Sequence, residues 1–307
     1  MPNPVPTPQP RPAPAPAIEL VFHPQQDAGY EHFSPGMPPF APDALRVGRV
    51  NAWWLAEAAL LSYWKPADAI PRFRAAGFDA VLLEAGALQC YIARTDSAAI
   101  VAFRGTQPDE WGDVLDDTLY ALAPWVHPGT HVHLGFKLAL ERVWDTLAGA
   151  LGPDDGSRRV WFTGHSLGAA LATLAADRLP HTAGVCTFGS PRVGDQAFVR
   201  RYNRRLGARA ARYVNDADVV THVPPRLPFP YDHVGGARFI ASDGHVSTVR
   251  PRLAHWVGHL FGRTGPLHEM TQGLLGGQRA TAPDFLLDHM PRAYAVALWN
   301  DYVLHGD

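Results

Sequence analysis

The sequence has little cysteine, no long hydrophobic run and no large excess of charge of either sign. Two of its 307 residues are cysteines, Cys90 and Cys186, so a disulfide scaffold is excluded, and their apolar surroundings indicate buried thiols. No run of about 18 apolar residues is present, which argues against a membrane-spanning helix. The formal net charge of -2, with scattered basic residues, argues against a nucleic-acid partner. A content of 47% hydrophobic residues is typical of a globular protein with a substantial core.

The N-terminal segment, residues 1–17, alternates proline with small or polar residues in MPNPVPTPQPRPAPAPA. It lacks the charged start and apolar core of a secretory signal, which predicts a cytoplasmic protein. Its composition predicts a disordered, solvated polyproline tail that packs no core. Residues 18–307 contain no internal repeat and no linker, so we expect them to form a single domain.

Past this tail, helical and strand-like segments alternate along the chain. Helical spacing occurs at 51–64, 133–151, 167–179 and near 195–206, and β-rich runs occur at 79–85, 88–95, 98–105, 158–163, 184–190 and 211–218. The Asp96-Ser97 break predicts a hairpin between two of these strands. Strands that alternate with helices predict an α/β fold, with a mostly parallel central sheet covered by helices on both faces.

The pentapeptide GHSLG, residues 164–168, lies where an expected strand turns into an expected helix. Glycines permit a sharp turn of this kind, which exposes a serine hydroxyl at the top of a sheet, so Ser166 is a candidate nucleophile. The N–H of Leu167, at the start of the helix, can donate to an oxyanion. The pentapeptide alone is a weak signal, because chance produces it in about one chain in ten of this length. The alternative is a structural turn serine.

A serine nucleophile needs a base and an acid, and in this type of fold the chain order is serine, acid, histidine. The strand 211–214 runs into a polar loop that holds Asp216 and Asp218, and sheet enzymes place catalytic groups at strand ends. Either aspartate could be the acid, while the other would cap or turn the loop. Fifteen histidines leave several candidates for the base.

Five blocks of the sequence together resemble a known family. They are VAFRGT (101–106), HLGF (133–136), GHSLGAALATLAA (164–176), TFGSPRVGD (187–195) and VNDADVVTHVPP (214–225). In this order they are similar to the class 3 lipases, the fungal-type triacylglycerol lipases, over roughly residues 50–300. The resemblance implies an α/β-hydrolase fold and the hydrolysis of carboxylic esters through a Ser-His-Asp triad. It also implies a lipase that acts on acylglycerols or related lipids, at a lipid–water interface.

The resemblance also assigns individual residues. The family's acid closes an Asn-x-x-Asp element, which here ends at Asp218. The family's base lies late in the chain near the start of the last helix, where His289 is followed by Tyr294; His268 is the alternative. Thr106 corresponds to the second oxyanion donor beside Leu167.

A lid covers the active site of the family at the position of residues 107–125. Trp111, Val114 and Leu115 could shield an apolar acyl groove there, and the alternative is a surface helix with a buried stripe. Nothing in the sequence requires a metal or an organic cofactor. A phospholipase A1, a thioesterase or an acyltransferase with the same triad, and a non-catalytic binding protein on the same fold, are the alternative functions.

Overall fold

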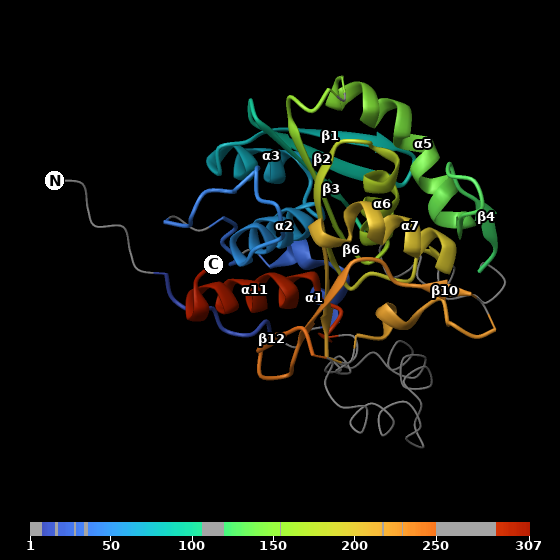
Figure 1. Cartoon of the computed structure of the whole chain (residues 1–307). Helices are drawn as coiled ribbons and strands as arrows, with labels where there is room; N and C mark the ends of the chain where they lie inside the picture. Colours follow the sequence, from blue (N-terminus) through green and yellow to red (C-terminus); the bar gives the residue numbers. More distant parts are fainter. Residues whose placement is uncertain are drawn as a thin grey trace, which may run out of the picture.

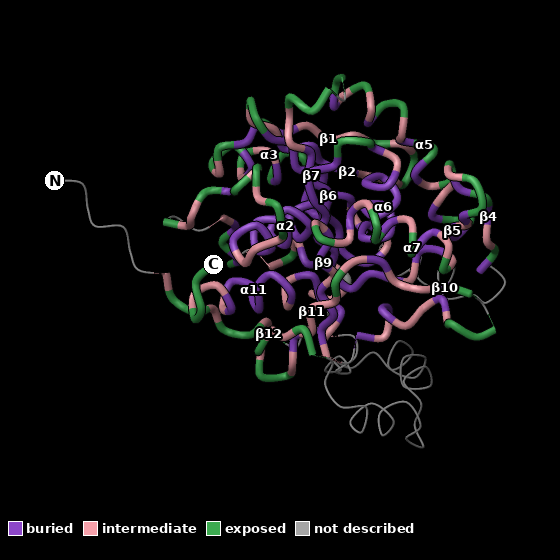
Figure 2. The backbone as a smooth tube through the Cα atoms, in the orientation of Figure 1, coloured by how far each residue is buried: buried purple, intermediate pink, exposed green. Residues whose placement is uncertain are grey.

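The structure is a computed structural model in which a twisted central sheet lies between two layers of helices (Figure 1). It describes residues 8–15, 18–27, 29–33, 36–105, 120–153, 155–216, 218–228, 230–249 and 287–307. The purple, buried tube runs through the central strands and the helices on both sides of them (Figure 2). The core therefore has two halves, one on each face of the sheet.

Eight strands form the central sheet, in the spatial order β1-β2-β3-β6-β7-β9-β11-β12. They are β1 (Asp79–Ala85), β2 (Leu88–Arg94), β3 (Ala98–Phe103), β6 (Arg159–His165), β7 (Thr182–Phe188), β9 (Ala210–Asn215), β11 (Gly236–Ile240) and β12 (Val246–Ser247). The pairs from β3 to β11 are parallel, and the pairs at both ends of the sheet are antiparallel. The carboxyl ends of β3, β6, β7 and β9 consequently meet at one edge of the sheet.

One face of the sheet is covered by α2 (Arg49–Leu61), α3 (Pro66–Ala75) and α11 (Pro291–His305), and the other by α5 (Leu134–Leu151), α6 (Leu167–Arg178) and α7 (Gln196–Leu206). Strand β3 shows how the sequence serves both layers. Ile100 and Ala102 face the first layer, whereas Ala99 and Val101 face the second. An apolar run without polar positions is what a strand buried on both faces requires.

Shorter elements complete the described part of the chain. They are α1 (Ile18–Phe22), the 3-10 turns η1 (Pro24–Gln26), η4 (Gly207–Arg209) and η5 (Val219–His222), and a second sheet of β10 (Tyr231–Asp232), β8 (Gly194–Asp195), β5 (His131–His133) and β4 (Leu122–Pro124), in that spatial order. Within the described ranges, no helix has the length and hydropathy needed to cross a bilayer.

The predicted α/β arrangement is confirmed, including the antiparallel hairpin of β2 and β3 around Asp96 and Ser97. The sequence did not predict α3, and Pro66 begins this helix at its first position rather than merely following α2. A proline is accepted there because the first helical N–H groups need no intrahelical partner. Strands β11 and β12 and the small sheet were also not predicted.

Residues 9–11 of the N-terminal segment lie against the body of the protein. The Trp299 indole donates to the carbonyl of Gln9 (2.6 Å), and the Asn300 side chain pairs with both backbone groups of Arg11 (2.7 and 2.9 Å). The Arg11 guanidinium also reaches the fully buried carboxylate of Glu57 on α2, at 2.9 Å. The prediction of a solvated tail that packs no core is therefore wrong for residues 9–11. The backbone groups of an extended segment have no partners within that segment, so they can bond the side chains of α11. The buried Glu57 carboxylate needs a cation, which Arg11 supplies. The domain boundary at residue 17 stays a prediction.

Candidate active site

Ser166 occupies the turn between β6 and α6, as the sequence predicts. Its backbone has φ 57° and ψ -127°, a conformation that non-glycine residues rarely adopt. Its N–H donates to the carbonyl of Phe188 at the end of β7 (3.0 Å), which anchors the strained turn to the neighbouring strand. Strained backbone of this kind concentrates at functional sites, so the observation favours the nucleophile over an ordinary turn serine.

The two glycines of GHSLG are required because backbone segments approach closely there. A Cβ on Gly164 would lie 2.3 Å from the carbonyl group of Gly168, and a Cβ on Gly168 would lie 2.2 Å from the carbonyl oxygen of Phe103. Any side chain at either position would push α6 away from β6 and β3. The pentapeptide thus sets the distance at which the first turn of α6 stands above the sheet.

Asp218 lies just beyond the end of β9, is fully buried, and accepts hydrogen bonds from three donors. The N–H of Val220 donates to Oδ1 (3.0 Å), the hydroxyl of Tyr294 donates to Oδ2 (2.5 Å), and His289 Nδ1 lies 2.8 and 2.9 Å from the two oxygens. Burial and the nearby Asp218 raise the pKa of Tyr294 well above its ordinary value, so its hydroxyl keeps the proton that it donates. These donors replace the water that a buried carboxylate loses.

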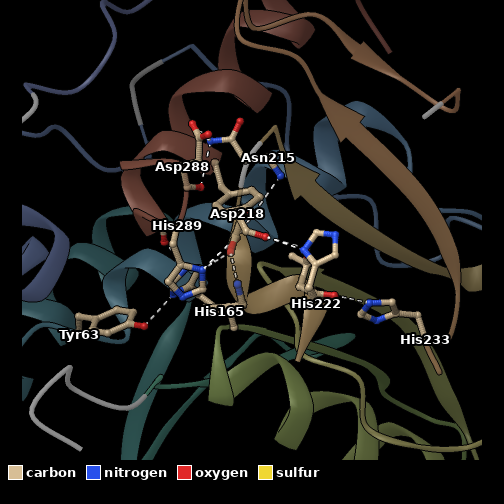
Figure 3. A network of polar contacts seen from close by, with 11 residues as sticks. Tyr63, His165, Asn215, Asp218, His222, His233, Asp288 and His289 are labelled. Atoms are coloured by element: carbon tan, nitrogen blue, oxygen red, sulfur yellow. Dashed lines mark hydrogen bonds and ion pairs between the residues drawn. The ribbon is translucent and has the colours of Figure 1, made fainter. Parts of the chain in front are cut away.

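His289 stands two residues before α11 and is buried. Figure 3 shows its ring against Asp218. A carboxylate can only accept, so Nδ1 carries a proton, and Nε2 is the nitrogen left to present a lone pair. This is the tautomer that a general base for a serine hydroxyl needs.

Ser166 and the Asp218–His289 pair meet at the edge of the sheet where the parallel strands end. A Cβ on Gly189, the residue after β7, would lie 2.7 Å from Asp218 Oδ2 and 2.8 Å from His289 Cε1, so the pair rests directly on this backbone. Ser166 is bonded to the preceding residue, Phe188. His165, next to the serine, has its ring centroid 4.3 Å from that of His289. The structure therefore brings the three predicted triad residues into one buried cluster.

The predicted oxyanion donors are only partly described. Leu167 is the first residue of α6, whose initial N–H groups have no intrahelical acceptor. Thr106 lies outside the described residues, directly after Gly105, which is two residues beyond the end of β3. Arg104 supports this loop, since its backbone N–H and its guanidinium bond the backbone carbonyl and side-chain oxygen of Gln89 on β2. The predicted lid residues Trp111, Val114 and Leu115 also lie outside the described residues.

The remaining histidines near the acid loop and the second aspartate, Asp216, have other positions and contacts than the triad residues. His222 Nδ1 lies 3.3 Å from the backbone carbonyl of Asp218, and His233 Nε2 lies 2.7 Å from that of Thr221, so both brace the acid loop (Figure 3). His268, the alternative base, is outside the described residues. Asp216 donates its backbone N–H to Ile240 on β11.

The sequence shows Tyr294 at the spacing from His289 that the family uses, but it indicates no role for the Tyr294 hydroxyl. Only the folded chain brings that hydroxyl to Asp218, 76 residues away. Across the described residues, no group of three or more histidine, cysteine or acidic side chains is placed to hold a metal ion.

Comparison with known proteins agrees with this geometry. Residues 100–227 match the family model described as Lipase (class 3), a segment that runs from β3 through Ser166 to the loop beyond Asp218. This segment belongs to the class 3 lipase family. The family expected from the five sequence blocks is thereby confirmed.

Among curated relatives, phospholipase A1-II 4 of Oryza sativa subsp. japonica is 34% identical over 180 residues, which cover 48% of this chain and 44% of the relative. A secreted mono- and diacylglycerol lipase of Malassezia globosa is 32% identical over 151 residues, which cover 44% of this chain and 49% of the relative. The chain thus matches about half or less of each of these relatives. The cytoplasmic location predicted from the N-terminus gains no support from them.

A solved triacylglycerol lipase, described as having a serine-protease triad as its catalytic centre, is 26% identical with a TM-score of 0.51. The alignment covers 61% of this chain and 78% of that chain. The predicted α/β-hydrolase fold, with its mostly parallel sheet, is confirmed by this likeness.

Proposed function

We propose that this class 3 lipase chain is a carboxylic ester hydrolase in which Ser166 is the nucleophile, His289 the general base and Asp218 the acid that orients it. The observation that carries the proposal is the buried Asp218–His289 contact of 2.8 Å, formed at the same sheet edge as the strained Ser166 turn. Three residues from distant parts of the chain, each with the side chain that its role requires, are brought together there.

In the acylation step, the Ser166 Oγ attacks the ester carbonyl carbon while its proton passes to His289 Nε2. The Asp218 carboxylate stabilises the imidazolium that forms. Negative charge develops on the carbonyl oxygen, and the Leu167 N–H at the positive end of α6, with Thr106 as the second donor, would hold it. The carbon–oxygen bond to the alcohol then breaks, and His289 returns the proton to the leaving alkoxide.

In the deacylation step, His289 takes a proton from water, whose oxygen attacks the acyl-enzyme. The second tetrahedral intermediate uses the same oxyanion donors. It releases the carboxylic acid and returns the proton to Ser166 Oγ.

The proposed substrates are acylglycerols or related lipids, met at a lipid–water interface. Support comes from the names of the curated relatives, a mono- and diacylglycerol lipase and a phospholipase A1. Trp111, Val114 and Leu115 are proposed to contact the acyl chain, by analogy with the family's lid. The rice relative makes a phospholipase A1 the second candidate.

The test is hydrolysis of p-nitrophenyl esters of graded acyl length, below and above their solubility limits, by the wild type and by Ser166→Ala. We expect the variant to fold normally and to lose at least about 10³-fold in kcat, because no other group supplies the nucleophile. Ester hydrolysis that survives in the variant would overturn the assignment of Ser166, and an inactive wild type would favour the non-catalytic binding protein.

A second measurement separates the two lipid activities. Release of fatty acid from diacylglycerol and from a phosphatidylcholine with different chains at its two positions would be compared. Preferential cleavage of the diacylglycerol supports the acylglycerol lipase. Preferential release of the sn-1 chain of the phospholipid makes the protein a phospholipase A1.

A further inference from the structure

The His165 side chain connects two parts of the site that the reaction sequence above leaves separate. It lies at the end of β6, immediately before the proposed nucleophile, and is 2% exposed. Its Nε2 lies 2.7 Å from the backbone carbonyl of His289, and its Nδ1 lies 2.8 Å from the hydroxyl of Tyr63 (Figure 3). Both ring nitrogens of His165 are therefore used inside the protein.

The direction of each hydrogen bond follows from the chemistry of the partners. A carbonyl oxygen only accepts, so His165 Nε2 carries a proton and donates it to the His289 carbonyl. Burial and the neighbouring His289 hold the pKa of His165 well below its ordinary value, so the ring is neutral and Nδ1 is an acceptor. Tyr63 must then donate its hydroxyl proton to Nδ1.

Tyr63 extends this chain of contacts to the loop after β3. The Tyr63 hydroxyl lies against the backbone of Gly105, and burial raises the pKa of this hydroxyl well above its ordinary value. The contact is close, since a Cβ on Gly105 would lie 2.1 Å from the hydroxyl oxygen. Gly105 is the residue before Thr106, the proposed second oxyanion donor.

We propose that Tyr63 and His165 are positioning residues that tie Gly105, the residue before the proposed oxyanion donor, to the backbone of the general base. The Gly105 backbone contacts the Tyr63 hydroxyl, that hydroxyl donates to His165 Nδ1, and His165 Nε2 donates to the His289 carbonyl. This relay holds Gly105 and the backbone of the base at one fixed separation. It rests on the proposed ester hydrolysis.

Neutrality of His165 matters as much as its position. The ring centroids of His165 and His289 are 4.3 Å apart, and His289 becomes an imidazolium when it takes the serine proton. A cationic His165 at this distance would oppose that charge, whereas the neutral ring does not. The relay thus sets both the geometry and the electrostatics of the base.

The test compares four variants with the wild type on a soluble p-nitrophenyl ester. In Tyr63→Phe the donor to His165 is lost, in His165→Gln an amide N–H can still reach the His289 carbonyl, and His165→Leu removes both bonds. We expect Tyr63→Phe to lower kcat about tenfold with KM changed less than about twofold, since positioning errors act on the transition state. We expect His165→Gln to retain more kcat than His165→Leu, and the double variant Tyr63→Phe/His165→Leu to lose no more than His165→Leu alone.

Tyr202→Phe is the matched control, because Tyr202 is a fully buried tyrosine of α7 in the opposite half of the core. It should leave kcat unchanged. The proposal is overturned if Tyr63→Phe behaves like this control, if its loss appears in KM alone, or if the losses multiply in the double variant. If His165→Leu fails to fold, the comparison of Tyr63→Phe and His165→Gln with the control decides.

A spectroscopic measurement tests the relay independently of activity. Ring ¹⁵N chemical shifts of His165 should report a neutral imidazole with the proton on Nε2 throughout pH 5 to 8, and in Tyr63→Phe this preference should weaken. A His165 that becomes an imidazolium in this range, or that carries its proton on Nδ1, refutes the relay even in an active enzyme. An inactive wild type with the expected tautomer refutes the ester hydrolase while the arrangement of the hydrogen bonds stands.

Discussion

At the scale of single residues, the acid shows why two aspartates two positions apart are not equivalent. Asp218 caps η5, and its carboxylate faces His289 and the Tyr294 hydroxyl. The backbone N–H of Asp216, in contrast, donates to the carbonyl of Ile240 on β11, just beyond the end of β9. The local sequence left both aspartates open as the acid. The Asn-x-x-Asp element of the family indicated Asp218, which is also the aspartate that the folded chain places against His289.

The pair of substitutions Asp218→Asn and Asp216→Asn tests this difference. An amide at position 218 would present an N–H to His289 Nδ1, so the ring would move its proton to Nε2 and could no longer accept one from Ser166. We expect kcat to fall by about 10³–10⁴-fold in Asp218→Asn and to change less than about twofold in Asp216→Asn, measured with a soluble ester. Equal losses in both variants would mean that the acid has been misassigned.

At the scale of elements, α5 begins with a histidine that serves as its N-cap. The neutral His133 ring accepts from the N–H of Phe136 and stacks on the Phe136 ring, and burial lowers the pKa of His133 to about 4. The unfolded chain, with the ordinary value of 6.5, binds one more proton than the folded chain between these two values. This residue's contribution to stability is therefore complete above pH 6.5 and is lost as the pH falls towards 4.

The substitution His133→Asn isolates that contribution, because asparagine is a good N-cap that does not titrate. We expect the wild type to lose more free energy of unfolding than the variant between pH 6.5 and 4, by roughly 3 kcal/mol at most. Urea titrations at both pH values measure the free energy of unfolding of each protein. The buried His165 is present in both, so its own titration does not contribute to the difference between them. Parallel pH profiles would show that His133 does not titrate in this way.

The junction of β6 and α6 gives a second prediction at this scale. Gly168→Ala would place a methyl group 2.2 Å from the carbonyl oxygen of Phe103, so we expect a loss of about 3 kcal/mol or more in the free energy of unfolding, or no folded protein. Gly149→Ala is the matched control on α5, where a Cβ meets no atom within 4 Å. It should stabilise the protein by about 0.5–1 kcal/mol. A tolerated Gly168→Ala would contradict the close approach of α6 to β3.

At the scale of the whole molecule, residues 9–11 join α2 to α11, the helix that follows His289. Burial would raise the pKa of Glu57, but bonds and charges from His32, Arg11 and Tyr30 outweigh it and hold this pKa below its ordinary value. Arg11 is thus one of the groups that make a charged Glu57 tolerable in the core.

The substitution Arg11→Ala removes this cation while Tyr30 and His32 still bond the carboxylate. We expect it to lower the free energy of unfolding by roughly 2 kcal/mol, the usual cost of losing a hydrogen bond to a buried charge. Arg46→Ala, at an exposed position, should change stability by less than about 0.5 kcal/mol. Thermal unfolding of both variants decides, and equal stability would mean that the segment is not held through Arg11.

Sequence patterns predicted the sheet, the main helices and a set of candidate site residues, because these depend on local periodicity and on short motifs. The docking of Gln9 and Arg11 could not be predicted, since their partners lie 19 to 290 residues away and the proline-rich composition indicates a tail. The contacts of the Tyr294 hydroxyl with Asp218 and of Tyr63 with His165 could not be predicted for the same reason, since the partners are far apart in the sequence. Strands such as β11 and β12 are too short to show a period.

The central claim is that Ser166 is a nucleophile activated by His289 and Asp218. The most direct measurement is reaction of the intact chain with a fluorophosphonate probe, followed by digestion and mass spectrometry to locate the adduct. We expect one adduct, on Ser166, formed at least about 10²-fold more slowly in His289→Asn, because the base is then absent. No adduct in the wild type, or an adduct on another residue, would contradict it.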